Sequence, residues 1–313
     1  MTRQEQVAMI GVRVMLEYFH PWPNSAGFYL ARERGWYRDA GLDVELVVHD
    51  PWRGDTLDHL LAKAVQFGVF PSNRLLVRRA LGQPLRAIAA INHSGLESIQ
   101  TLTDSAILRP RDLAGRRLAL NPTPRGLAMV RHLVKTDGGD PDAVIMVDSG
   151  ARELRPEELA AGVADASFGG YWAWEALMAS SIADERRVVW PVDQIGAPAY
   201  HSYLLGAHED TLTADRELTR AFLAVTSRGF LAAAHDPLSA LPAYEQITPY
   251  FPSELLAQSL QRIAPTWLYE GQWGEQRQTL LEPYAQWLHE HQVLADPGAW
   301  LEATTNAYLP EPV

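Results

Sequence analysis

The chain has no cysteine among its 313 residues, which excludes disulfide bonds, a thiolate nucleophile and cysteine-ligated metal centres. It also has no dense cluster of lysine and arginine. Its formal net charge of −11 would repel a phosphate backbone, so we expect no nucleic-acid partner. The lack of cysteine leaves the compartment open, because cysteine-free chains are compatible with both reducing and oxidising environments.

The amino terminus lacks the pattern of a secretory leader, which needs a basic start, an apolar stretch of about 7–15 residues and a small-residue cleavage site. The apolar stretch over 7–16 is interrupted by Gly11 and Arg13. As written, the chain is therefore expected to be cytoplasmic. No window approaches the roughly 18 uninterrupted apolar residues of a membrane helix, so we expect a protein that does not span a membrane.

Several motifs with well-understood chemistry are also missing. The chain has no phosphate-binding loop, no dinucleotide-binding turn, no zinc-protease motif and no serine-hydrolase elbow. His289 and His291 flank Glu290, but residues two apart on a helix point in different directions, so we expect no zinc site there. The sequence predicts no cofactor, no metal and no catalytic residue of these types.

The residues that are present favour two folded lobes. Hydrophobic residues make up 47% and charged residues 21% of the chain, enough to bury a core in each of two domains. Strand and helix patterns alternate, which favours parallel sheets covered by helices. In the first lobe we expect strands at 12–18, 44–48, 66–70, 85–90 and 99–102, and helices at 26–40, 56–63 and 72–81.

The pattern then restarts with a short helix and turn at 111–115. In the second lobe we expect strands at 117–120, 144–147, 166–169 and 188–192, and helices at 126–135 and 156–161. Helices alone follow, at 216–234, 237–247, 253–263, 276–291 and 297–304. The predicted division is 1–102 plus 197–313 for the first lobe with its carboxyl-terminal helices, and 103–196 for the second.

A weak internal repeat relates residues 61–68 to residues 159–169. Each segment has the pattern of a helix end, a tight turn, a short strand and a glycine. Such a unit ends at the carboxyl edge of a parallel strand, where open α/β sheets bind ligands. Two units suggest two sheets that face one cleft, although any strand–helix–strand unit can give this pattern by chance.

Three groups of residues carry a resemblance to a known family. They are the opening motif at 27–31, 33–37 and 41–45, the segment Gly-Gly-Tyr-Trp-Ala-Trp-Glu at 169–175, and the segments at 137–141 and 305–310. The chain resembles the substrate-binding proteins of the thiamine-pyrimidine (hydroxymethylpyrimidine) type, which are related to sulfonate and riboflavin binders and to fungal pyrimidine synthases.

This resemblance implies an α/β fold of two Rossmann-like lobes, that of type II periplasmic binding proteins, with a helical carboxyl-terminal tail. It implies a planar heteroaromatic ligand held between aromatic side chains and a carboxylate or amide. It also implies a possible ABC permease as partner and the extracytoplasmic location usual for the family. The synthase branch uses a lysine, a histidine four residues later and a cysteine-rich loop. Here Phe70 and Arg74 stand at the first two positions, so binding is favoured over catalysis.

Candidate ligand-binding residues of the first lobe follow its expected strands. Aromatic rings stack on planar ligands, while amides and imidazoles supply hydrogen bonds. Trp22 could instead cap the core, and His20 could bond a loop carbonyl. Ser72 and Asn73 could accept a ligand group or form an ordinary helix cap. The candidates are Tyr18, His20, Trp22, Asn24, Ser72, Asn73 and His93.

In the second lobe, three aromatics and a carboxylate follow a glycine pair at a strand end. Glu175 could pair with the ring nitrogen and exocyclic amine of an aminopyrimidine, whereas Trp174 is expected to be core. Thr123 begins a helix beside Arg125, which we expect to be solvated. The candidates are Thr123, Tyr171, Trp172 and Glu175, with Tyr200 and His201 near the return crossing.

Two hypotheses therefore stay open. The first is a binding protein that presents a pyrimidine-like or other planar solute to an ABC permease, by a hinge motion. The second is a leaderless cytoplasmic enzyme on the same fold, of the pyrimidine, thiamine or menaquinone-pathway type, with His20, His93 or Glu175 as acid or base. A ligand sensor without transport is not distinguished from the first.

Overall fold

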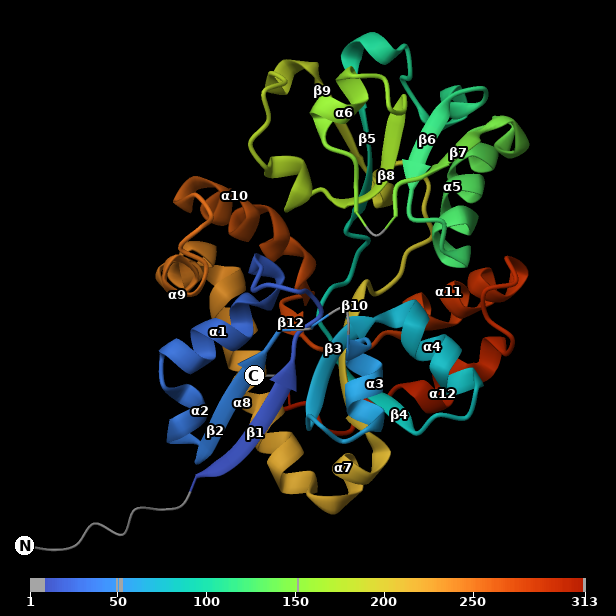
Figure 1. Cartoon of the computed structure of the whole chain (residues 1–313). Coiled ribbons are helices and arrows are strands. Elements are labelled where there is room, and N and C mark those ends of the chain that lie inside the picture. Colours follow the sequence, from blue (N-terminus) through green and yellow to red (C-terminus); the bar gives the residue numbers. More distant parts are fainter. Residues whose placement is uncertain (1–8, 49, 51–52, 151, 312–313) are drawn as a thin grey trace, which may run out of the picture. The chain divides into compact units, whose positions relative to one another are not determined.

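The computed structural model describes residues 9–48, 50, 53–150 and 152–311, which form two compact units (Figure 1). The first unit comprises Met1–His93, His201–Ala285 and Asp296–Val313, and the second comprises Ser94–Tyr200 and Gln286–Ala295. Residues 1–8, which include the start of the stretch considered as a leader, lie outside the described residues.

The first unit contains a five-stranded sheet in the order β2-β1-β3-β10-β4. β1 pairs in parallel with β2 and β3, while β10 runs antiparallel to β3 and β4. The strands are β1 Ile10–Met15, β2 Leu42–Val47, β3 Phe67–Pro71, β4 Leu85–Ala90 and β10 Tyr203–His208. The helices between them are α1 Ala26–Glu33, α2 Trp36–Asp39, α3 Thr56–Leu61 and α4 Ser72–Ala80.

The single helix expected at 26–40 is wrong, because the chain breaks it into α1 and α2. Gly35 has φ of 73°, a left-handed conformation that glycine adopts at no steric cost and that ends a helix. The break lets Tyr37 turn into the core, where it is 1% exposed and its ring stacks 5.8 Å from that of Phe222.

The carboxyl-terminal part covers the first sheet with helices. α8, Arg216–His235, brings Phe222 onto β3, where its ring stacks 4.3 Å from that of Phe67. The other helices are α7 Glu209–Ala214, α9 Leu241–Ile247, α10 Ser253–Ile263, α11 Gln278–Glu290 and α12 Trp300–Ala303. Sequence patterns missed β10 and the short antiparallel hairpin of β11 Leu268–Tyr269 and β12 Gln272–Trp273.

The second unit repeats this topology, with the sheet order β7-β6-β8-β5-β9. β6 is parallel to β7 and β8, and β5 is antiparallel to β8 and β9. The strands are β5 Glu97–Leu102, β6 Arg117–Leu120, β7 Ile145–Asp148, β8 Ala166–Tyr171 and β9 Arg187–Pro191, and the main helices are α5 Pro124–Thr136 and α6 Pro156–Ala160.

The internal repeat corresponds to equivalent positions in the two sheets. α3 leads into β3 and α6 leads into β8, and each of these strands is the third in its sheet, between a parallel and an antiparallel neighbour. The sheets are therefore mixed rather than fully parallel as expected. The repeat reflects the duplicated topology of the units.

The boundaries between the units differ from those expected. Residues 99–102 were assigned to the first lobe, but β5 pairs with β8 and β9 in the second sheet. The chain passes between the units after His93 and after Tyr200, and residues 286–295 belong with the second unit. Within the described ranges, no helix is both long and apolar enough to cross a membrane.

Candidate functional site

The first unit gathers polar and aromatic side chains at one edge of its sheet. β1, β3 and β4 end at this edge, and β10 begins there because it runs antiparallel to β3 and β4. The chain segments after these strand ends contain every first-lobe candidate from the sequence. We call this set of segments the first-unit face.

Glu17 lies at the centre of the first-unit face, two residues after β1 ends. Its Oε1 accepts hydrogen bonds from Trp22 Nε1 and Asn24 Nδ2, both at 2.9 Å, and its Oε2 accepts one from Ser25 Oγ at 3.4 Å. Burial raises the pKa of Glu17, although these hydrogen bonds oppose the shift. Sequence reasoning missed Glu17, even though it directly precedes the candidate Tyr18.

Aromatic rings surround this carboxylate. Tyr18 lies 4.8 Å from the ring of His20 and 5.5 Å from that of Trp22, and His20 lies 5.0 Å from Phe251. His20 Nδ1 is 2.8 Å from the carbonyl oxygen of Pro21, so His20 does bond a loop carbonyl, and burial lowers its pKa. Trp22 is fully buried, and a stacking role for it stays a prediction.

Asn24 has a structural role that sequence reasoning did not foresee. Its Nδ2 donates to Glu17 and to Asn92 Oδ1, and its Oδ1 accepts from Asn92 Nδ2 and Trp267 Nε1. These four bonds use the full capacity of the amide group. Asn24 therefore positions Glu17, and its contact with a ligand stays a prediction.

Ser72 and His201 join chain segments to each other. Ser72 is the first residue of α4 but not its cap, and its Oγ donates to the carbonyl of His201 at 2.5 Å. The Nδ1 of His201 donates to the carbonyl of Asn92, and its Nε2 accepts from the backbone amide of Arg277, both at 3.0 Å. Both ring nitrogens of His201 are thus bonded within the protein, and its contact with a ligand stays a prediction. Asn73 is half-buried.

His93 differs from His201 in its hydrogen bonding. Both of its ring nitrogens are buried and have no hydrogen-bond partner among the described residues. Its ring lies 5.1 Å from that of His201 and 6.1 Å from that of Tyr269. Burial lowers the pKa of His93 to about 3, with a further contribution from the charges of His201 and Arg277. His93 is therefore a neutral imidazole with unused bonding capacity.

The second unit has a comparable edge, where β6, β7 and β8 end and β5 begins. We call the segments at this edge the second-unit face. Glu97 pairs with Tyr171, and the register then shifts so that Gly169 and Gly170 form a bulge. Gly169 has φ of 127°, and a Cβ on Gly170 would lie 2.7 Å from Gln100 Nε2. The glycine pair is required by this bulge, a feature common beside functional sites.

Glu97 is held by a cation and a phenol on the second-unit face. Arg125 Nη1 donates to Glu97 Oε1, and the Tyr200 hydroxyl donates to Oε2 at 2.7 Å. Arg125 also stacks over the Tyr200 ring, 5.1 Å from its centroid. The expectation that Arg125 is solvated is wrong, because its side chain is 10% exposed in this ion pair.

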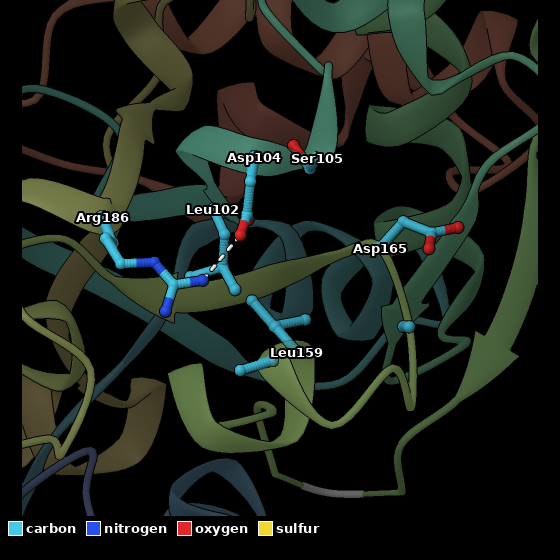
Figure 2. Close-up of a pocket in the computed structure, with 8 residues that line it drawn as sticks. Leu102, Asp104, Ser105, Leu159, Asp165 and Arg186 are labelled. Carbon is cyan, nitrogen blue, oxygen red and sulfur yellow. Dashed lines mark hydrogen bonds and ion pairs between the residues drawn. The ribbon is translucent and has the colours of Figure 1, made fainter.

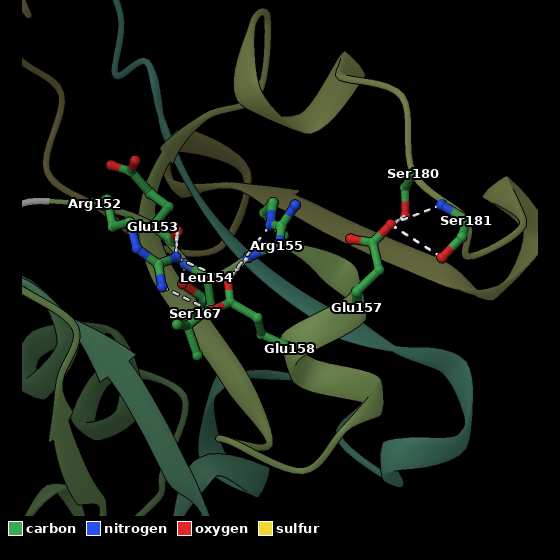
Figure 3. A network of polar contacts seen from close by, with 9 residues as sticks. All are labelled: Arg152, Glu153, Leu154, Arg155, Glu157, Glu158, Ser167, Ser180 and Ser181. Carbon is green, nitrogen blue, oxygen red and sulfur yellow. Dashed lines mark hydrogen bonds and ion pairs between the residues drawn. The ribbon is translucent and has the colours of Figure 1, made fainter.

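Glu153 lies beside the glycine bulge on a loop fixed by its neighbours. Arg152 binds Glu158 through two hydrogen bonds of 2.8 and 2.7 Å, and Glu157 accepts bonds from Ser180 and Ser181 (Figure 3). The carboxylate of Glu153 points away from these contacts. Burial raises the pKa of Glu153, and the negative charge of Glu97 raises it further. The loop therefore holds an acid whose ionised form is disfavoured.

We expect Glu153→Gln to stabilise the ligand-free protein at about pH 7. Because the folded-state pKa of Glu153 is raised, its ionisation destabilises the fold progressively as pH rises above the ordinary value of 4.5. Denaturant unfolding at about pH 4 and about pH 7 should show a difference only at the higher pH. A variant less stable than the wild type at pH 7 would contradict this interpretation.

The remaining candidates of the second unit differ in their surroundings. Tyr171 donates its backbone amide to Glu175 Oε2 at 2.9 Å, and Trp172 donates its Nε1 to the carbonyl of Gly95 at 3.1 Å. Trp174 is fully buried, as expected of a core residue. Thr123 caps α5, with its Oγ1 accepting from Gly126 N at 3.1 Å, so it forms the ordinary cap weighed as the alternative.

A small hollow elsewhere in the second unit is a weaker candidate. It has a volume of about 140 Å³ and is lined by Leu102, Asp104, Ser105, Leu159, Ala160, Ala164, Asp165 and Arg186. Asp104 and Arg186 form an ion pair in it, while Asp165 points away from that pair (Figure 2). The hollow is smaller than the roughly 300 Å³ of small ligand sites and lies at the amino-terminal end of β8, opposite the usual binding edge.

Sequence reasoning missed Glu17, Glu97, Glu153 and Arg277 as candidate residues. Glu153 follows the expected strand at 144–147, so the strand-end rule that selected other residues also applies to it. Glu97 is the first residue of β5, and only the antiparallel direction of β5 brings it to this edge. No local signal connects Arg277 with His201. Within the described part of the chain, no three histidine, aspartate or glutamate residues form a group that could hold a metal ion.

Comparisons with known proteins identify the family and the fold. The family model described as "NMT1/THI5 like" matches residues 22–240. A curated relative, the formylaminopyrimidine-binding protein of Halalkalibacterium halodurans, is 25% identical over 307 residues, covering 95% of this chain and 90% of the relative.

Solved structures show the same fold at low sequence identity. The periplasmic aliphatic sulphonate binding protein SsuA from Escherichia coli has a TM-score of 0.70 at 15% identity, covering 94% of this chain and 96% of that chain. The alkanesulfonate-binding protein SsuA from Xanthomonas axonopodis pv. citri, bound to MOPS, has a TM-score of 0.68 at 14% identity, covering 94% and 98%. The fold is therefore that of type II periplasmic binding proteins, as the resemblance implied.

Proposed function

The chain belongs to the NMT1/THI5-like family, and we propose that it binds a planar amino-heteroaromatic solute of the aminopyrimidine class. The observation that carries this proposal is the carboxylate of Glu153, which lies beside the glycine bulge of the second-unit face. Arg125 neutralises Glu97, whereas burial and the negative charge of Glu97 disfavour the ionised form of Glu153. A ligand for this face must bring hydrogen-bond donors or positive charge.

An aminopyrimidine supplies such donors. Its exocyclic amine carries two N–H groups, and its ring nitrogen can bind a proton that a carboxylate shares. Glu175, whose Oε2 accepts the hydrogen bond of the Tyr171 amide, lies on the same face and is a second carboxylate for a ligand donor. Burial raises the pKa of Glu153, and a bound donor would give its carboxyl group a hydrogen-bond partner. We assign the amine of the ligand to this pair.

The flat ring of the ligand requires aromatic contacts. Tyr171 and Trp172 follow the glycine bulge and are half-buried, and Tyr18 is half-buried on the first-unit face. A stacked ring contributes about 1–3 kcal/mol when the partner is a nucleobase, a planar heterocycle of similar size. We propose that the rings of Tyr171 and Trp172 stack on the ligand.

The role that fits these contacts is delivery of the solute to an ABC permease. The curated relative is named a formylaminopyrimidine-binding protein, and the relative from Escherichia coli is named periplasmic, which supports an extracytoplasmic location. A sulfonate ligand fits the second-unit face poorly, because a sulfonate group has no N–H to donate to the carboxyl groups of Glu153 and Glu175.

Thermal unfolding in the presence of candidate solutes tests this proposal. We expect 4-amino-5-hydroxymethyl-2-methylpyrimidine and formylaminopyrimidine to raise the unfolding temperature, because binding to the native state alone stabilises it by mass action. A ligand at about 100 times its dissociation constant adds about 2.7 kcal/mol. An alkanesulfonate should have no effect. Stabilisation by the sulfonate and not by either pyrimidine would contradict the proposal.

A further inference from the structure

We propose that Gln100 donates a hydrogen bond from its side-chain amide to a ring nitrogen of the ligand, beside the amine that the carboxylates accept. This inference rests on the proposed function and deepens it, because such a ligand must carry an acceptor nitrogen next to its amine. Every residue that the argument uses lies in the second unit.

The first argument is the state of the Gln100 side chain. Gln100 is only 5% exposed, yet its amide group forms no hydrogen bond with a side chain or backbone group of the described residues. An amide group can donate two hydrogen bonds and accept two, and nearly all buried polar groups have partners in folded proteins. The amide of Gln100 is therefore available to a bound molecule.

The second argument is the position of this amide at the glycine bulge. A Cβ on Gly170 would lie 2.7 Å from Gln100 Nε2. The same position is 3.2 Å from Glu153 Cγ and 3.6 Å from Glu175 Cβ. The amide and both acids thus approach one point, which the absence of a side chain on Gly170 leaves open. Gln100 therefore belongs to the group of side chains that carries the proposed function.

The third argument is the orientation of the amide. The nitrogen end of Gln100, rather than its oxygen, lies nearest the point that Glu153 and Glu175 approach. Carboxyl oxygens accept hydrogen bonds and repel a carbonyl oxygen, so the two acids favour this orientation over the flipped one. Gln100 is therefore a hydrogen-bond donor among acceptors, a property that the carboxylates cannot supply.

The base of this side chain is fixed by β5. Gln100 pairs with Ser167 of β8 on one side and with Val189 of β9 on the other. A side chain that starts from a strand bonded along both edges loses little further freedom when a ligand binds, so its contribution to affinity is preorganised.

A ligand that satisfies this arrangement has a donor beside an acceptor. In an aminopyrimidine the exocyclic amine donates, and the neighbouring ring nitrogen accepts through its lone pair. Glutamine recognises adenine by such a pair, an amine and a nearby ring nitrogen. Here the carboxylates accept from the amine, and Gln100 donates to the ring nitrogen. A ring with the amine but without the adjacent nitrogen would leave the buried amide unsatisfied, which is unfavourable.

Calorimetric titration of the full chain with two matched probes tests this role. The probes are 4-amino-5-hydroxymethyl-2-methylpyrimidine and 4-amino-5-hydroxymethyl-2-methylpyridine, in which a C–H group replaces the ring nitrogen beside the amine. The measured quantity is the dissociation constant of the pyridine divided by that of the pyrimidine. We expect this ratio to be about tenfold larger for the wild type than for Gln100→Met, equal to about 1.4 kcal/mol. The different basicity of the two rings is common to both proteins and cancels in the comparison.

Two further variants keep the test decisive. Gln100→Leu also removes the amide from a strand position that accepts a branched apolar residue, and it should lower the ratio equally if the methionine variant does not fold. Gln194→Met is the matched control, because it makes the same chemical change at an exposed glutamine of the same unit. It should leave the ratio at the wild-type value.

The possible outcomes separate the two proposals. If the wild type binds the pyrimidine but the ratio is unchanged in the Gln100 variants, the role of Gln100 is overturned and a bound water molecule is the partner of its amide, while the proposed function stands. If neither probe binds to the wild type, the proposed function fails and this inference fails with it.

Discussion

Replacing Arg125 with leucine is expected to lower the free energy of unfolding of the second unit by about 3–5 kcal/mol. The substitution removes the cation that pairs with Glu97 while the carboxylate stays 21% exposed, so a charge is left nearly buried without its counter-ion. Tyr200 keeps its hydrogen bond to Glu97, but a neutral phenol does not replace the lost charge. Denaturant unfolding followed by tryptophan fluorescence measures the effect.

The matched control for this prediction is an exposed ion pair. Arg13 and Glu45 lie 2.7 Å apart with side chains 48% and 61% exposed, and such surface pairs contribute at most about 1 kcal/mol. The double variant Arg125→Leu with Glu97→Leu should recover much of the lost stability, because no charge is then left alone. Equal effects of Arg125→Leu and Arg13→Ala would contradict the importance given to the buried pair.

Replacing Glu175 with glutamine is expected to weaken aminopyrimidine binding by about 100-fold, or about 2.7 kcal/mol. Hydrogen bonds to a charged group contribute about 1.5–3 kcal/mol each, and glutamine replaces the carboxylate with a neutral amide. The fold should be unaffected, because the glutamine Oε1 can still accept the bond from the Tyr171 amide. Calorimetric titration with 4-amino-5-hydroxymethyl-2-methylpyrimidine measures the change.

Glu185→Gln is the control for this variant. Glu185 is an exposed glutamate of the same unit, so its substitution makes the same chemical change away from the second-unit face. It should leave the dissociation constant at the wild-type value. Normal binding by Glu175→Gln would remove Glu175 from the site and leave Glu153 as the remaining carboxylate for the amine.

Sequence patterns predicted most elements of the fold, because strand and helix periodicities are local. β4 and β6 have the predicted bounds, and the repeat correctly marked the equivalent strands β3 and β8. The features that local patterns missed depend on pairing between strands that lie far apart in the sequence. β10 was not predicted, and the expected parallel sheets proved to be mixed, because the direction of β5 and β10 follows from which strands they join.

The candidate site was predictable only in outline, for a related reason. The strand-end rule identified the correct segments, but it cannot tell a residue with unused donors from one satisfied by its neighbours. Asn24, His201 and His93 were all candidates on sequence, yet the first two are fully bonded within the protein. Their partners Asn92 and Arg277 lie 68 and 76 residues away along the chain.

The central claim is that an amino-heteroaromatic ligand binds through the carboxylates of the second-unit face. A crystal structure of the protein with 4-amino-5-hydroxymethyl-2-methylpyrimidine tests it most directly. We predict that the exocyclic amine lies within hydrogen-bond distance of Glu175 or Glu153, with the pyrimidine ring against Tyr171 or Trp172. Ligand found in the hollow beside Asp104 and Arg186, with the second-unit face empty, would contradict the account.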